Sequence, residues 1–132
     1  DMLLPILKSK PNHEKLLFEL SYSYNALGQH DQAINILEKA LKSHPKKELF
    51  YKEMVFALAN SERLQEAEKN YALYVTKAET TTYLAETAYN IAYNYYLVKN
   101  KPKFEEWAAI VVKQKEVNPQ ILNSLEYFKS QL

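Results

Sequence analysis

The side chains of this sequence best suited to acid–base or metal chemistry near neutral pH are its three histidines, His13, His30 and His44. No two of them have the H-x-x-x-H or H-E-x-x-H spacing that places two metal ligands on one face of a helix. All three lie near the ends of expected helices, so we interpret them as solvated loop residues. The sequence contains no cysteine, which excludes a thiol nucleophile, a disulfide framework and a cysteine-ligated metal.

Neighbouring carboxylates could also act as an acid and a base. The two pairs, Glu66 with Glu68 and Glu105 with Glu106, are expected on exposed helix faces, where they are solvated and do not form a glycosidase-like pair. The single glycine, Gly28, cannot supply a glycine-rich loop that binds phosphate. The sequence therefore predicts a protein that is not an enzyme, with no catalytic residue, metal ion or cofactor.

Basic side chains form two short runs beside aromatic residues, Lys46 with Lys47, and Lys99 with Lys101 and Lys103. Such runs could hold phosphate or nucleic acid. The chain as a whole has 17 basic and 16 acidic residues and a net charge of +1, so it has no general attraction for a polyanion. We expect a protein or peptide partner and no nucleic acid.

Length and composition indicate one globular domain, since 132 residues with 47% hydrophobic content can bury a core. No apolar run reaches the roughly 18 residues that cross a bilayer, and the start lacks the pattern of a secretion signal. We expect a soluble chain with no membrane span, in the cytoplasm rather than the periplasm or outside the cell. Because the sequence does not begin with Met, we also expect a piece of a longer protein.

Apolar residues recur at three- and four-residue spacing on both sides of Gly28, which predicts two helices joined by a turn. Leu17, Leu20 and Tyr24 precede the glycine, and Ala33 and Leu37 follow it. We expect Gly28 to end the first helix in a left-handed conformation, which a side chain would oppose. With little else in the sequence to make turns between strands, the fold class is predicted to be all-α.

The chain matches itself when it is shifted by 34 residues, which places Pro11 on Pro45, Leu20 on Met54 and Ala33 on Ala67. A 34-residue helical hairpin with this spacing resembles the tetratricopeptide repeat (TPR) family. The family's marked positions are held here by Leu17, Leu20, Ser21, Tyr24, Ala33, Leu37, Ala40 and Pro45. The resemblance implies a right-handed α-solenoid of antiparallel helix pairs, in which small residues let the two helices of a pair lie close together.

The resemblance divides the chain into five parts. Residues 1–11 are the end of a preceding helix, residues 12–45, 46–79 and 80–117 are three repeats, and residues 118–132 are a capping helix that begins at Asn118 and Pro119. The third repeat is stretched, because Trp107 lies 40 residues after Ala67. We assign three extra residues near TTTY and three near NKPK, which predicts a first helix over about residues 82–99 that is longer than its fellows. Trp107 then stands where alanine is usual, which leaves either a splayed hairpin or a register that is wrong by one turn.

In such a solenoid the first helices of successive repeats line the concave face, and this position implies a binding groove. The candidate partner-binding residues are Phe18, Tyr22, Asn25, Lys52, Phe56, Asn60, Tyr89, Asn90, Tyr93 and Tyr96. Phe18 and Tyr22 replace the lysine and asparagine of the family's clamp for a terminal carboxylate, so that ligand is not expected. An aromatic wall favours a peptide with apolar side chains, its backbone held by the asparagine amides.

Two alternatives remain open at this point. The aromatic residues could instead pack between helices, since aromatic side chains also fill solenoid cores. The chain could also be a structural module that associates with itself or with a preceding repeat through the apolar residues at positions 3–7.

Overall fold

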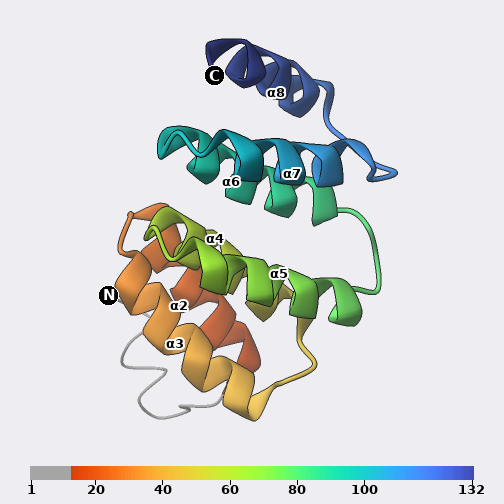
Figure 1. The fold of residues 1–132 in the computed structure, drawn as a ribbon. Coiled ribbons are helices and arrows are strands. Elements are labelled where there is room, and N and C mark those ends of the chain that lie inside the picture. Colours follow the sequence, from red (N-terminus) through yellow and green to blue (C-terminus); the bar gives the residue numbers. More distant parts are fainter. Residues whose placement is uncertain (1–12) are drawn as a thin grey trace.

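The computed structural model describes residues 13–132, and within that range every regular element is a helix. Three antiparallel hairpins follow one another along the chain (Figure 1). They are formed by α2 (Glu14–Ala26) with α3 (His30–Ser43), α4 (Glu48–Asn60) with α5 (Leu64–Lys77), and α6 (Leu84–Leu97) with α7 (Lys101–Val112), and α8 (Pro119–Gln131) lies over the last of them. The all-α solenoid prediction is confirmed. Residues 1–11 and the self-association segment at positions 3–7 lie outside the described residues.

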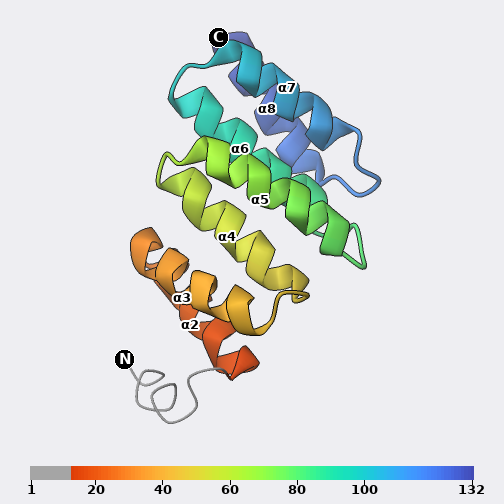
Figure 2. The same ribbon diagram turned by 60° about the horizontal axis from the view of Figure 1, so that its bottom comes forward.

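The hairpins stack in order. The second helix of each hairpin packs against the first helix of the next element, and α4 also packs against both α2 and α6. Figure 2 shows the same succession from another side. The first helices of the three hairpins therefore share one face, as a helical-repeat solenoid requires, and side chains from all three can meet there.

Each first helix ends in the same type of cap. Gly28 has φ 76°, and Gln29 N–H donates to the Tyr24 carbonyl five residues back at 2.8 Å. Glu62 and Lys99 repeat this arrangement with φ of 63° and 60°, and the N–H of the residue after each donates to Leu58 and Tyr95. These are the bonds of a Schellman cap. The left-handed conformation predicted for Gly28 is confirmed, and two non-glycine residues adopt it as well.

These caps fix the register of the repeats, because Gly28, Glu62 and Lys99 lie 34 and then 37 residues apart. The third repeat is thus three residues longer, with two extra residues in the connection between α5 and α6 and one in α6 itself. The prediction of a long first helix over residues 82–99 was wrong, because α6 has 14 residues where α2 and α4 have 13. The predicted second insertion near NKPK is absent, since α7 begins two residues after its cap as α3 and α5 do.

With this register, Phe104 and not Trp107 occupies the buried position of Ala33 and Ala67, so the predicted position of Trp107 was wrong by one turn. The third hairpin exchanges large and small residues between its helices. Its first helix carries Ala88 where the earlier first helices have Leu17 and Tyr51, and its second helix carries the phenylalanine. The total core volume is nearly kept, which packed cores tolerate well.

Helix α8 begins as predicted, with Pro119 in its first turn and the Asn118 side chain accepting from Gln120 N–H at 2.8 Å. Its inner side contributes Ile121, Leu125 and Phe128 to the core. The Phe128 ring stacks on Tyr96 at a centroid distance of 4.3 Å and lies 5.4 Å from Tyr93. The last hairpin is therefore covered along part of α6. Among residues 13–132, no helix has both the length and the apolar composition that a bilayer crossing needs.

Candidate partner-binding groove

An aromatic side chain recurs at one position of each first helix. Tyr22 on α2, Phe56 on α4 and Tyr93 on α6 follow the same offsets of 34 and 37 residues as the caps. Tyr22 is 56% exposed and Phe56 is 38% exposed, whereas Tyr93 is half-buried. The aromatic wall predicted from the sequence therefore exists, and it is open at its first two positions.

Two shallow depressions of about 210 Å³ each lie beside this row, one between α2 and α4 and one between α4 and α6. Both are lined by Lys52, Phe56 and Glu86, so they adjoin at these side chains. We call the two together the α4 groove. The remaining lining residues are Tyr22, Asn25, Ala26, Glu53, Thr87, Tyr89 and Asn90.

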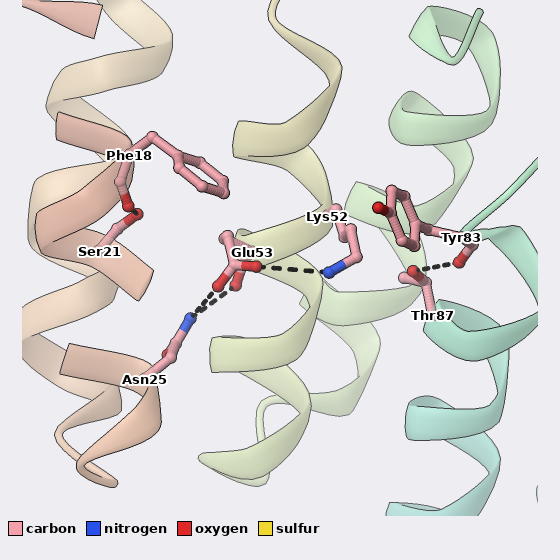
Figure 3. A network of polar contacts seen from close by, with 7 residues as sticks. All are labelled: Phe18, Ser21, Asn25, Lys52, Glu53, Tyr83 and Thr87. Carbon is pink, nitrogen blue, oxygen red and sulfur yellow. Dashed lines mark hydrogen bonds and ion pairs between the residues drawn. The ribbon is translucent and has the colours of Figure 1, made fainter. Parts of the chain in front are cut away.

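Buried polar contacts form the floor between α2 and α4 (Figure 3). The Asn25 side chain is 5% exposed, and its Nδ2 donates to both the backbone carbonyl and the carboxylate of Glu53, at 3.3 and 3.1 Å. Ser21, which is also buried, donates within its own helix to the Phe18 carbonyl at 2.9 Å. Burial without such bonds would cost about 1–3 kcal/mol per group. The two bonds from Asn25 to Glu53 join α2 to α4.

Lys52 joins the floor to α6. Its Nζ lies 3.5 Å from Glu53 Oε2 and 5.0 Å from the centre of the Tyr83 ring, the distance of a cation–π contact. Thr87 then donates to the Tyr83 carbonyl at 2.7 Å, which fixes the start of α6 (Figure 3). The lysine charge is thus balanced within the protein by a carboxylate and an aromatic face.

His30 supports the groove from its side. One ring nitrogen lies 2.9 Å from Asn25 Oδ1, and the ring packs edge-to-face against the Phe56 ring at a centroid distance of 5.7 Å. Partial burial lowers the pKa of His30, and the nearby Asp31 carboxylate opposes this only in part. His30 was expected to be a solvated loop residue, but it is half-buried because it packs between these two groove residues.

A second asparagine cluster links α4 to α6. Asn60 Nδ2 donates to the Phe56 carbonyl at 2.8 Å and to Asn90 Oδ1 at 3.4 Å, and Asn94 donates back to Asn60 Oδ1 at 3.4 Å. The amides of Asn25 and Asn60 are therefore engaged within the protein. A peptide backbone bound by these two amides, as the sequence predicted, would have to replace these contacts.

Three other predicted site residues lie at the two ends of the aromatic row, Phe18 on α2 and Tyr93 and Tyr96 on α6. Phe18 is half-buried, with its ring 6.2 Å from Tyr22 and 6.4 Å from Phe50. Tyr93 and Tyr96 pack against Phe128 of α8 and do not line the groove. Packing between helices, the alternative left open by the sequence, therefore accounts for this part of the wall.

Four groove residues were not among the candidates, namely Ala26, Glu53, Glu86 and Thr87. A uniform period of 34 residues assigns Glu86 and Thr87 to the wrong positions in the repeat. The observed offset of 37 residues makes Glu86 equivalent to Leu49 of α4 and Lys15 of α2. Their place in the groove could therefore be predicted only with the location of the extra residues known.

Outside the groove, Glu68 joins the second and third hairpins. Its carboxylate accepts from the Tyr95 hydroxyl at 2.5 Å, from Lys103 Nζ at 3.0 Å and from Trp107 Nε1 at 3.0 Å. Burial raises the pKa of Glu68, but the three donors outweigh it, and the net pKa is lowered. The prediction that Glu68 is an exposed, solvated carboxylate was wrong, because its side chain is only 18% exposed.

Comparison with known families gives a match to the family described as the bacterial transcriptional activator domain, over residues 14–81, which cover the first two hairpins and the start of the connection to α6. This match does not name the TPR family itself, whereas the helical-repeat architecture that the resemblance implied is present. No curated protein and no solved structure matches the chain.

Proposed function

Because the chain belongs to the bacterial transcriptional activator domain family, we propose that it is a non-catalytic interaction module in which the α4 groove holds a segment of a partner protein. The observation that carries this proposal is the pair of adjoining depressions on α2, α4 and α6, lined by an exposed aromatic side chain from each of two successive repeats. Exposed aromatic side chains in a concave site supply large contact area at small entropic cost.

The groove is preorganised for binding. Its floor residues Asn25, Glu53 and Lys52 are bonded to one another, and no buried side-chain nitrogen or oxygen of the described residues lacks a hydrogen-bond partner. A bound segment would therefore bury Tyr22 and Phe56 without first breaking internal bonds. Saving this cost is what gives a rigid site affinity. The same bonds leave these polar groups little freedom for acid–base chemistry, which supports a non-catalytic role.

The family description also raises direct contact with DNA as an alternative function. Charge argues against DNA as the ligand of this groove, because its lining contains one lysine and two glutamates. Proteins that bind DNA present clusters of Lys and Arg to the phosphates, and the chain as a whole has a net charge of +1. We therefore propose a protein segment as the partner and no nucleic acid.

The test uses the 132-residue chain and a phage library of random dodecapeptides, followed by calorimetry with the selected peptides. We expect peptides rich in apolar residues, whose affinity falls about tenfold or more in Phe56→Ala, as truncation of a central aromatic contact does. The matched control is Tyr127→Ala, which removes an exposed aromatic residue of α8 outside the groove. Selected peptides that bind Phe56→Ala as well as the wild type would contradict the proposal. So would tighter binding of a random 30-base-pair duplex than of any peptide.

A further inference from the structure

Glu86 lies where the two depressions of the α4 groove adjoin, since it lines both of them. Its side chain is exposed, and it makes no ion pair with any residue in the range 13–132. This carboxylate is thus available to a ligand. Among residues 13–132 it is the only charged groove residue that forms no ion pair, although Lys52 lines the same depressions.

The other two charges of the groove neutralise each other. Lys52 and Glu53 form an ion pair, and their side chains are 20% and 5% exposed. The Lys52 ammonium additionally faces the Tyr83 ring. A ligand therefore meets a lining with one uncompensated negative charge, which Glu86 provides.

Aromatic rings accompany this carboxylate. Phe56 lines both depressions with Glu86, Tyr89 lines the one toward α6, and Tyr22 lines the one toward α2. A guanidinium group suits such surroundings better than an ammonium, because it is planar, stacks on aromatic faces and pairs with a carboxylate through two parallel hydrogen bonds.

Resting on the proposed function, we propose that the α4 groove selects a protein segment that carries an arginine beside apolar residues. The arginine pairs with Glu86 and stacks on Phe56 or Tyr89. The apolar residues cover Phe56 and Tyr22 in the adjoining depression. Glu86 is then the residue that determines specificity, and the aromatic rings supply the affinity shared by any apolar segment.

The dodecapeptide library that tests the proposed function also tests this inference. Among peptides that lose affinity in Phe56→Ala, we expect arginine to be enriched about threefold or more over the unselected library. For one such peptide, Glu86→Gln should weaken binding about three- to tenfold, the range of a partly exposed ion pair with its hydrogen bonds. The control Glu38→Gln, which removes the same charge from α3 outside the groove, should leave the affinity unchanged.

Exchanging the charges of Glu86 and the peptide arginine distinguishes a direct ion pair between them from a general electrostatic attraction. The peptide with its arginine changed to glutamate should bind the wild type weakly, and Glu86→Arg should restore its affinity to within about threefold of the original complex. Circular dichroism of the Glu86 variants checks that they remain folded. The inference is overturned if peptides that depend on Phe56 show no arginine enrichment, or if Glu86→Gln and Glu38→Gln weaken binding equally. Either result leaves the proposed function intact, whereas peptides that do not depend on Phe56 overturn both.

Discussion

Removing the Glu68 carboxylate is expected to weaken the joint between the second and third hairpins. Glu68 on α5 is the common acceptor for Tyr95 of α6 and for Lys103 and Trp107 of α7. Tyr95 and Trp107 are buried, so Glu68→Ala would leave a hydroxyl and an indole N–H without their partner. At about 1.5–3 kcal/mol for each hydrogen bond to a charged acceptor, these two contacts account for about 3–6 kcal/mol.

The Lys103 ion pair adds little to that figure, and access of water reduces it. Lys103 is 39% exposed, so its ion pair is screened by water and contributes little. The adjacent depression lined by Tyr95, Asn100 and Lys103 can also admit water to the donors that remain. We therefore expect Glu68→Ala to lower the free energy of unfolding by about 2–4 kcal/mol. Glu68→Gln keeps one acceptor oxygen and should lower it by about 1–2 kcal/mol.

Urea unfolding followed by fluorescence measures this effect directly, because Trp107 is the only tryptophan and itself donates to Glu68. The matched control is Glu66→Ala on the same helix, an exposed carboxylate paired with Arg63, which should cost less than about 0.5 kcal/mol. Equal effects of Glu68→Ala and Glu66→Ala would refute the view that burial makes this cluster important.

The same cluster sets a pH dependence. The pKa of Glu68 is lowered in the folded protein, so the unfolded chain takes up a proton there first as the pH falls. The stabilisation is therefore complete above the ordinary glutamate pKa and is lost as the pH falls below it. Glu68→Gln should lose less stability than the wild type between neutral pH and this acid range.

Three further predictions follow from the caps, the groove and the terminal helix. Gly28→Ala should cost about 1 kcal/mol in urea unfolding, because a left-handed residue gains a side chain, whereas Glu62→Ala at φ 63° should be nearly neutral. Burial lowers the pKa of His30, so the unfolded chain binds the proton first and stability should fall as the pH drops through 6.5. A His30→Gln variant should lose less stability than the wild type over the same pH range, and an equal loss would contradict a lowered His30 pKa as the cause. Phe128→Ala should cost about 1–2 kcal/mol, since the ring is half-buried, and Tyr127→Ala, whose ring is 60% exposed, less than about 0.5 kcal/mol.

Most of the fold was predictable because it depends on local patterns. The spacing of Leu17, Leu20, Ala33 and Leu37 determines a hairpin, and the 34-residue shift repeats it. The third hairpin was harder, since its core exchanges the sizes of residues between helices. With Phe104 in the place of alanine, the sequence match moved to Trp107, and a second insertion was needed to explain it. Only the backbone cap at Lys99 fixes the register there.

The sequence was enough to predict which residues lie on the face that carries the candidate site, but not which hydrogen bonds they form. Which residues lie on the first helices follows from periodicity, and Tyr22, Lys52, Phe56, Tyr89 and Asn90 do line the groove. Whether an amide is free follows from its partners on other helices. Asn25 reaches Glu53 across 28 residues of sequence, and no repeat pattern contains that contact.

The groove is lined by residues inside the family match and by residues that follow it. The match ends at residue 81, inside the connection between α5 and α6, which is two residues longer than the one between α3 and α4. Glu86, Thr87 and Tyr89 come after that point, yet they line the groove, and Tyr83, which also follows it, contacts Lys52 through its ring. The part of the site on α2 and α4 therefore lies within the family match, whereas the position of Glu86 depends on how α6 is joined to it. A different connection would move Glu86 relative to Phe56 while leaving the first two hairpins intact, and under the proposed function it would change which protein segment the groove selects.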